Sequence, residues 1–476
     1  MPLSCWVLFL FLRETFCFPF SAALPISLLA TAGWGVLGTR RPNKASGPAV
    51  SVLFFMALAG ALYISLSREG AENFNYALGL ASPPMSVESS GTVIDDREWG
   101  FGRVALLDSP KGRYVLKLDA VPDGPPDFTA GDRVSFSGRL GPFKRALDGR
   151  AFDEYLYWRA QGAVAAITRP EARRLGVSRG LVSWRTSLAS RIKKALPPRT
   201  AGYVLASLVG ERDRSLSDLH KSVGTSHLLA VSGAHVAIVF GILWFFLKGV
   251  RSRLYIISAL VWLYVAMTGA APSAMRAAFM IQLVIGGRLI GRRGKPFNSV
   301  CAAGAIMLIH NPWLFDDVGW RLSMLAALSI TSTGSIQTRA RFFLASALVW
   351  LATTLQASWT FGGSPLVGLF VNIFALPAFG VLFPLAFALS MPSLLGLSFG
   401  VYAAAIPEFL FLRWERFSLN LLALCPWNVD FSVPLLLLGI AALVYFFGRA
   451  CGFGGTRACF ASGISLFGVF ALLFLV

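Results

Sequence analysis

Repeated apolar runs of membrane-spanning length constrain this 476-residue chain more than any other feature of its sequence. A transmembrane helix needs about 20 consecutive apolar residues. Here 55% of the residues are hydrophobic and 14% are charged, whereas a soluble domain carries about 25% charged residues. This composition excludes a disordered chain, fits a soluble enzyme poorly, and predicts a polytopic α-helical membrane protein.

The apolar runs form two blocks on either side of a polar segment. Residues 1–67 are predicted to hold the N-terminal transmembrane helices, and residues 200–476 a larger transmembrane domain. The runs of the second block lie at about 227–247, 254–270, 273–290, 298–310, 319–333, 342–360, 365–391, 393–412, 433–448 and 458–476. So many runs predict a chain that crosses the bilayer several times.

The polar segment, residues 68–179, has the pattern of a small antiparallel β domain inserted after the N-terminal helices. Stretches such as Tyr114–Leu118 and Arg133–Ser137 alternate apolar and polar residues, and turn-rich clusters at Asp108–Gly112 and Val121–Pro126 separate such stretches. The order of short strands is compatible with an OB-type barrel, although strand propensity alone fits other small barrels equally well.

Residues 180–199 are predicted to form an amphipathic helix that lies on a membrane surface. Apolar residues recur at helical spacing from Leu181 to Leu196, and Pro197 ends the pattern. The basic residues of this helix are Arg185, Arg191, Lys193 and Lys194.

The net charge of +19 belongs mostly to the apolar blocks. Residues 68–179 contain 16 of the 43 basic and 15 of the 24 acidic residues. Short basic loops are typical of the cytoplasmic side of a membrane protein, and this bias is the main explanation of the charge. It predicts a cytoplasmic-membrane location with the β domain on the periplasmic or extracellular side. A polyanionic substrate is the alternative explanation, and the basic helix on the predicted outer side favours it.

The cysteines and histidines do not form a recognisable metal site. None of the six cysteines belongs to a C-x-x-C motif, and the chain contains neither H-x-H-x-D-H nor H-E-x-x-H. We therefore expect no metal ion and no cofactor.

The most informative motif is the stretch Gly224–Val236, which opens a predicted membrane helix. It contains His227, Ser232, Gly233 and His235. Ser232 and His235 are three residues apart and share a helix face. Polar groups at membrane depth suggest function, but a serine bonded to its own helix and histidines that pack between helices explain them equally well.

A second motif, Thr268–Met280, places Arg276 one turn inside a membrane segment that begins near Pro272. A buried arginine must find a carboxylate, a carbonyl or water, so Arg276 is a candidate to line an aqueous path or to contact phosphate. Snorkelling of its long side chain to the membrane interface is the simpler explanation.

Two further motifs contain polar residues within apolar sequence. In Asn311–Ser323, Asp317 either forms a local ion pair with Arg321, four residues on, or partners Arg276 or a histidine of the first motif. Ser323 closes this motif. Asn372 lies in a later apolar run, where an interhelical hydrogen bond would explain it.

These motifs together resemble the ComEC family of competence proteins. The matching sequences are H-L-L-A-V-S-G-x-H at His227–His235, T-G-x-x-x-S-x-x-R-A at Thr268–Ala277 and N-P…D-x-G-x-x-L-S at Asn311–Ser323. The segment from Asn372 to Pro377 resembles the family's later N-x-x-x-x-P element. One departure is Trp320-Arg321, where the family usually has Phe-Gln.

The resemblance implies a channel in the cytoplasmic membrane that passes single-stranded DNA into the cell during natural transformation, and not an enzyme. Many members continue into a metallo-β-lactamase-like domain, whereas this sequence resembles the form without it. The implied partners are therefore single-stranded DNA, the lipid bilayer and other parts of the uptake machinery: a DNA receptor, a cytoplasmic translocase and a separate nuclease.

The β domain and the amphipathic helix supply the candidate DNA-binding residues. Single strands bind to OB-type surfaces through basic and aromatic side chains. The basic candidates are Lys111, Arg113, Lys117, Arg133, Arg139, Lys144, Arg145, Arg185, Arg191, Lys193 and Lys194. The aromatic candidates are Tyr114, Phe136, Phe143, Tyr155, Tyr157 and Trp158, each of which would equally fill a barrel interior.

Two other functions use the same residues. A membrane-embedded hydrolase would use Ser232, His235 and Asp317, although the sequence shows no oxyanion donors. A transporter of small anions would use Arg276 as its binding group. In all three cases we expect Arg276, Asp317, His227 and His235 to meet near one water-accessible cavity.

Overall fold

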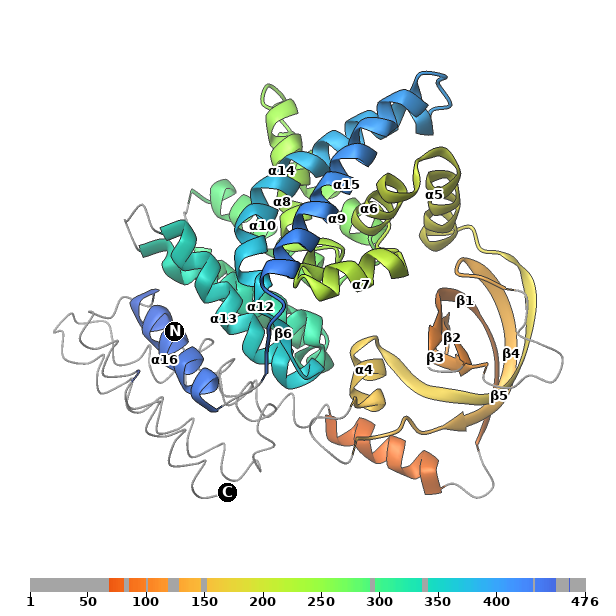
Figure 1. Ribbon diagram of the computed structural model, residues 1–476. Helices are drawn as coiled ribbons and strands as arrows, with labels where there is room; N and C mark the ends of the chain where they lie inside the picture. The colour runs from red at the N-terminus through yellow and green to blue at the C-terminus, as the bar shows by residue number, and fades with distance from the viewer. Residues whose placement is uncertain are drawn as a thin grey trace. The chain divides into compact units, whose positions relative to one another are not determined.

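The computed structural model describes two compact units (Figure 1). The described residues are 68–80, 85–99, 102–118, 128–146, 152–291, 296–335, 341–430, 433–450 and 462. The barrel unit comprises Met1–Thr186 and Ala305–Val318, and the helical unit comprises Ser187–Gly304 and Gly319–Val476. The predicted N-terminal helices and the predicted run 458–476 lie outside the described residues, apart from residue 462.

The barrel unit contains a closed five-stranded barrel with the strand order β1-β2-β3-β5-β4 (Figure 1). β3 and β5 run parallel, and the other neighbouring strands run antiparallel. The strands are β1 Ser86–Trp99, β2 Gly102–Ser109, β3 Gly112–Lys117, β4 Asp132–Gly141 and β5 Ala163–Val177. The small β domain expected from alternating hydrophobicity is confirmed, with two of its expected strands at β3 and β4.

The barrel has apolar packing on two sides of its sheet. Its interior contains Leu107, Leu116 and Phe136, all buried. The neighbouring residue Val115 points to the other side of β3 and is also buried, in a second cluster with Trp158 of helix α4 Glu154–Ala160. This helix covers part of the barrel surface, and therefore β3 is apolar on both faces.

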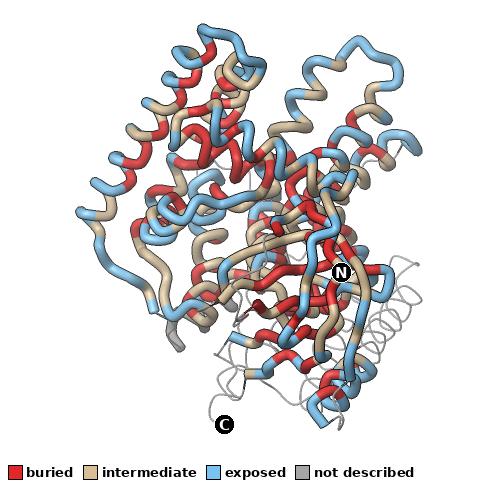
Figure 2. Tube along the Cα trace, turned by 90° about the vertical axis from the view of Figure 1, so that its right-hand side faces the viewer, coloured by how far each residue is buried: buried red, intermediate tan, exposed pale blue. Residues whose placement is uncertain are grey.

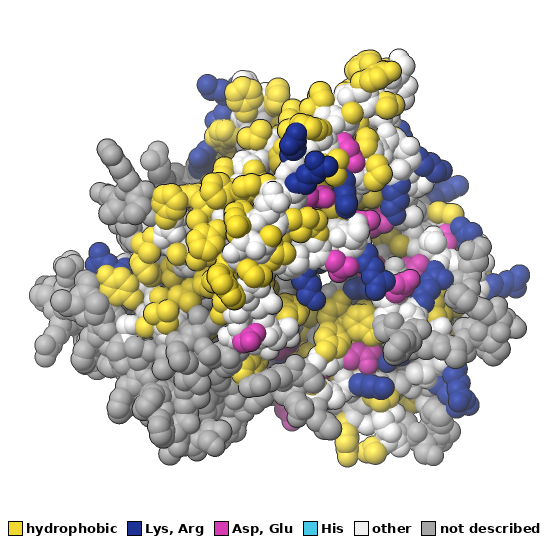
Figure 3. Space-filling view, in the orientation of Figure 1, with side chains coloured by type: hydrophobic (Ala, Val, Ile, Leu, Met, Phe, Trp, Pro, Cys, Tyr) yellow, Lys and Arg dark blue, Asp and Glu magenta, His cyan; other side chains and the backbone are white. Residues whose placement is uncertain are grey.

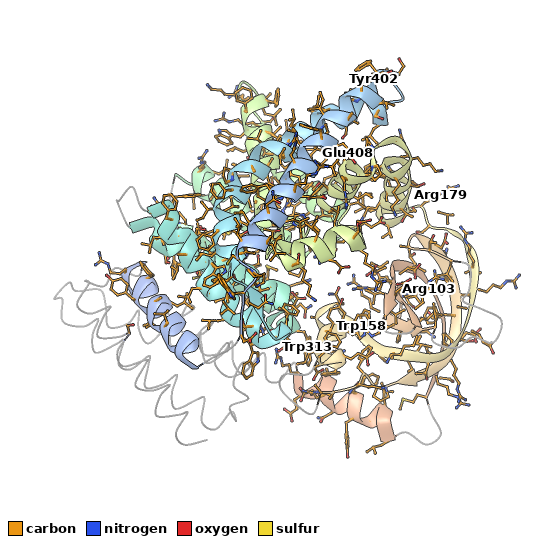
Figure 4. All side chains as sticks on the ribbon, viewed as in Figure 1. Arg103, Trp158, Arg179, Trp313, Tyr402 and Glu408 are labelled. Atoms are coloured by element: carbon orange, nitrogen blue, oxygen red, sulfur yellow. The ribbon has the colours of Figure 1, made fainter. Side chains whose placement is uncertain are left out.

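A short segment from the third sequence motif belongs to the barrel unit. The 3-10 helix η2 Pro312–Asp316 places the Trp313 ring 5.4 Å from that of Tyr155, in the same cluster as Trp158; Trp158 and Trp313 lie near each other in Figure 4. Arg68 forms a 2.6 Å ion pair with Asp316, 248 residues away in sequence. Its guanidinium also lies 5.0 Å from the Trp313 ring centroid.

The helical unit and the helix that leads into it contain the predicted apolar runs as helices. Every predicted run in the described part of this region corresponds to a helix. The main helices are α5 Leu181–Ala195, α6 Pro198–Leu208, α7 Arg214–Ser222, α8 Gly233–Phe246, α9 Arg253–Met267, α10 Pro272–Leu289, α11 Pro296–His310, α12 Val318–Ser332, α13 Arg341–Phe361, α14 Val367–Leu394, α15 Gly400–Leu424 and α16 Val433–Ala450. The 3-10 helix η1 Ser226–Leu228 precedes α8.

Two of the described helices, α13 and α14, are long and apolar enough to cross a membrane. α14 buries Val371, Ala375 and Phe379 on one side, whereas Phe374 and Val381 are exposed. Figure 2 shows such bands of buried and exposed residues alternating along the chain. In Figure 3 hydrophobic side chains gather over α13, α14 and α15, so that the helical unit is apolar outside as well as inside.

Gly131, just before β4, packs closely against the start of α5. We expect a side chain at this position to destabilise the fold. Its φ is +98°, and an added Cβ would lie 2.7 Å from Ser183 Cα. The control is Gly176→Ala, since Gly176 has φ +147° but open space around its Cβ position. We expect Gly131→Ala to lower the free energy of unfolding by about 1–3 kcal/mol more than the control, measured by chemical denaturation. Equal losses would show that the close approach to Ser183 is unimportant.

Candidate functional site

The first sequence motif forms a capped helix start. Ser232 is the N-cap of α8, and its side chain accepts a hydrogen bond from the His235 backbone. In return, the Ser232 N–H donates to His235 Nδ1 at 3.1 Å, and Ser232 Oγ lies 3.0 Å from the same nitrogen. This is a capping box in which histidine takes the place of the usual glutamate. The Ser232–His235 pair therefore stabilises the first turn of α8.

The His235 ring is buried against α14. Its centroid lies 4.4 Å from the Phe383 ring, and its Nε2 has no hydrogen-bond partner among the described residues. Two further histidines lie close by, one on α7 and one on η1. His227, on η1, is exposed and lies within electrostatic range of both His235 and the buried His220. The structure thus brings His227 and His235 into one region.

Arg276 lies beside the same helix start. It is 7% exposed; its Nε donates to Ser323 Oγ at 3.0 Å, and its Nη1 lies 3.9 Å from Met280 Sδ. An added Cβ on Gly233 would lie 3.2 Å from Arg276 Nη2. The second motif therefore contacts the first through Gly233 and the third through Ser323.

The loop before α8 also contacts the fourth motif. Asn372 Nδ2 donates to the Gly224 carbonyl at 3.4 Å. Gly224 has φ +72°, and a Cβ on it would lie 3.1 Å from Gly368 Cα in α14. A glycine is required at position 224 both by its backbone conformation and by this close approach.

Asp317 belongs to a different unit from the other expected site residues. It belongs to the barrel unit and follows η2, where its backbone N–H donates to the Leu314 carbonyl at 3.1 Å. His227, His235 and Arg276 belong to the helical unit. The meeting of Asp317 with these three residues stays a prediction.

A buried chain of polar groups next to this region was not expected from the sequence. Tyr203 of α6 lies with its hydroxyl 2.8 Å from His220 Nε2 and 3.5 Å from Glu415 Oε1 of α15. His220 Nδ1 lies 2.7 Å from Thr225 Oγ1, and Arg199 Nε lies 3.4 Å from Glu415 Oε2. Glu415, which closely follows the apolar run at 393–412, was the available signal.

Glu408, about two helical turns before Glu415 on α15, caps another helix. Its carboxylate accepts from the backbone N–H groups of Arg199 at 3.1 Å and Thr200 at 2.7 Å, at the start of α6. A carboxylate at a helix N-terminus satisfies free N–H groups and the helix dipole. Figure 4 shows Glu408 on α15. α15 thus contributes Glu415 to the polar chain and also holds the start of α6, the helix that carries Arg199 and Tyr203.

Several basic DNA-binding candidates of the barrel are engaged in ion pairs, which reduces the number available to DNA. Lys117 lies 2.7 Å from Glu154, with both side chains largely buried, so it is not available on the surface. Arg113 pairs with Asp108 at 3.4 Å, and Arg145 with Glu72 at 3.2 Å. The candidates that remain exposed outside these ion pairs are Lys111, Arg133, Arg139 and Lys144.

Two of these arginines share one outer face of the barrel. Arg133 and Arg139 are exposed on β4, and Arg173 of β5, exposed as well, lies opposite Ser135 in the strand register. Opposite residues of antiparallel strands lie on the same face of a sheet. Glu171 is on that face too, opposite Ser137. Glu88 of β1 is exposed on the same face, also opposite Ser137. The face therefore presents three guanidinium groups and two carboxylates.

Most of the expected stacking residues are buried in the two apolar clusters of the barrel unit. Tyr114, Phe136, Phe143, Tyr155 and Trp158 are buried, and burial raises the pKa of Tyr155 to about 12. Tyr157 is partly exposed. It packs against Trp99 at 5.2 Å and Phe152 at 5.4 Å, and accepts a 2.6 Å hydrogen bond from Arg97. Phe152, 62% exposed, is an accessible aromatic residue that the sequence did not single out.

The segment predicted as an amphipathic helix contains α5, and its position on a membrane surface stays a prediction. The basic residues of α5 have several roles. Arg191 Nη2 donates to the Leu394 carbonyl at 3.1 Å, and Lys193 pairs with Glu211. Lys194 is exposed, and Arg185 is half-buried. Ile192 and Leu196 are buried in the helical unit, whereas Trp184 is exposed.

The comparisons with known proteins identify the family. Residues 208–454 match the family model described as Competence protein, and this span contains the residues assembled around the start of α8. The chain belongs to the Competence protein family. It is 27% identical to ComE operon protein 3 of Bacillus subtilis strain 168 over 304 residues. The aligned region covers 60% of this chain. The chain spans 37% of the length of that curated relative. No solved structure matches the chain.

The buried polar chain predicts the effect of removing one hydroxyl. Tyr203→Phe leaves His220 Nε2 and Glu415 Oε1 without their shared partner, and we expect it to lower the free energy of unfolding by about 1–3 kcal/mol. Tyr255→Phe is the control, because Tyr255 is 68% exposed. Thermal unfolding of the purified variants measures the difference. Equal unfolding temperatures would mean that the Tyr203 hydroxyl contributes nothing.

Proposed function

We propose that this protein is a multi-pass channel of the cytoplasmic membrane that conducts single-stranded DNA into the cell during natural transformation. The family match over residues 208–454 carries this proposal. The printed name of the Bacillus subtilis relative, ComE operon protein 3, agrees with it. The protein would act in transport, with a separate DNA receptor, translocase and nuclease as its partners.

The apolar exterior of the helical unit supports the membrane location. α13 and α14 have the length and hydropathy of membrane spans, and shorter apolar helices such as α8 and α9 accompany them. Exposed aromatic residues include Phe245 and Phe374. An exterior of this kind is unfavourable in water and suits contact with lipid.

The barrel supports binding of a single strand on the outer side of the membrane. Its strand order and parallel β3–β5 pair suit an OB-like domain. The face with Arg133, Arg139 and Arg173 provides positive charge for phosphates, and Phe152 provides an exposed ring for stacking. The basic helix α5, next in sequence, adds Lys194 and other charges.

The hydrolase alternative loses support from the geometry. Ser232 accepts a hydrogen bond from the helix backbone as the N-cap of α8, and His235 Nδ1 accepts from the Ser232 N–H. Both residues therefore have a structural role that requires no nucleophile. The anion-transporter alternative keeps one supporting observation, the buried Arg276.

A transformation assay on a deletion strain tests the proposal. We expect deletion to abolish transformation while labelled DNA still reaches the periplasm, because only the inner-membrane step is lost. A wild-type copy should restore transformation, and an Asp317→Ala copy should restore it poorly if this carboxylate contributes to the channel. Normal transformation in the deletion strain would contradict the proposed function.

The salt dependence of oligonucleotide binding tests the barrel face. Each phosphate contact with a single strand contributes about −0.7 to the slope of log K against log salt. We therefore expect a variant with Arg133, Arg139 and Arg173 all changed to Gln to bind more weakly, with a slope shallower by about 2. Arg179→Gln, which removes an exposed charge beyond the end of β5, is the control. An unchanged slope in the triple variant would exclude this face.

A further inference from the structure

Arg276 is a buried cation without an anionic partner in the described part of its own unit. The residue is 7% exposed. It donates to the neutral hydroxyl of Ser323 and approaches the sulfur of Met280, and its Nη2 donates to no acceptor among the described residues. Burial of an unpaired guanidinium is costly, which indicates that something else completes this site.

The free Nη2 lies at the start of α8. A Cβ on Gly233, the first residue of that helix, would lie 3.2 Å from it. The Ser232 side chain satisfies the His235 N–H, whereas the N–H groups of Gly233 and Ala234 have no acceptor within the helix. These two groups carry the partial positive charge of the helix N-terminus.

A second helix adds positive potential at the same place. α10 begins at Pro272, so that Arg276 lies just after its first turn. The Ser273 hydroxyl donates to the Val231 carbonyl, which holds the start of α10 against the loop before α8. A guanidinium next to two helix N-termini is electrostatically unfavourable without an anion, and helix N-termini bind phosphate groups readily.

We propose that Arg276 Nη2 and the N–H groups of Gly233 and Ala234 bind one phosphate oxyanion. Because Gly233 has no Cβ, Arg276 Nη2 can lie close to these N–H groups, and an added methyl group would lie 3.2 Å from Nη2. This assignment deepens the proposed function and rests on it for the identity of the ligand: in the working channel, the phosphate is a phosphodiester of the passing DNA strand. The phosphate binds reversibly, and no covalent bond is formed or broken.

Binding of inorganic phosphate to the purified full chain in detergent tests the site. By isothermal titration calorimetry we expect Arg276→Gln and Gly233→Ala to weaken binding about tenfold or more, because each removes or blocks a charge-assisted hydrogen bond. Gly241→Ala is the matched control in the same helix, since nothing lies within 4 Å of its Cβ position. Arg288→Gln removes the same charge at the other end of α10.

Equal phosphate affinity in wild type, Arg276→Gln and Gly233→Ala would overturn the site, provided that circular dichroism shows each variant folded. Phosphate binding that appears only in an Asp317→Asn variant would overturn it too, because Arg276 would then already have a carboxylate partner. Weaker phosphate binding in phosphatidylglycerol nanodiscs than in phosphatidylcholine nanodiscs would assign the site to a lipid headgroup and overturn the link to DNA.

Transformation by the same variants separates this inference from the proposed function. We expect Gly233→Ala to reduce transformation and Gly241→Ala to leave it unchanged. Normal transformation by variants that have lost phosphate binding would overturn the assignment of the phosphate to DNA. Normal transformation by the deletion strain would instead overturn the proposed function, and the phosphate titration alone would then decide the site.

Discussion

A buried cation must have its charge compensated, and among the described residues Arg68 and Arg276 are buried arginines. Their charges are compensated in different ways. Arg68 lies against Asp316 at 2.6 Å, and this ion pair, with Trp313 beside it, holds a distant segment of the chain in the barrel unit. Removing one partner of such a pair leaves an uncompensated charge. Arg276 has only a hydroxyl and a thioether in the described part of its unit. The first arginine is therefore structural, whereas the second is available to a ligand.

The start of α8 is where the motifs of the helical unit meet. Ser232 and His235 cap the helix, Gly233 allows Arg276 to approach, and Gly224 packs on Gly368 of α14. Each contact requires a small or a polar residue at one position. The loop before α8 thus packs closely against α10 and α14. The N–H groups of Gly233 and Ala234 and Arg276 Nη2 remain available to a ligand.

The elements were predictable from sequence because their periodicity is local. Alternation over 114–118 and 133–137 predicted strands that became β3 and β4, and the apolar runs predicted α8 to α16. Pairing across the fold was not predictable. The contact of Lys117 with Glu154 withdraws a candidate DNA ligand, and the contacts of Tyr203 with His220 and Glu415 depend on how α6, α7 and α15 pack. Nothing in the spacing of these residues encodes that packing.

Photo-crosslinking in competent cells tests most directly whether the DNA strand passes the start of α8. A photoreactive amino acid at Ala234, exposed beside the free N–H groups, is compared with one at Phe374, exposed on the apolar side of α14. We predict that transforming DNA crosslinks as a single strand at position 234 and not at position 374. Cells that import DNA normally without any crosslink at position 234, or with equal crosslinking at both positions, would contradict it.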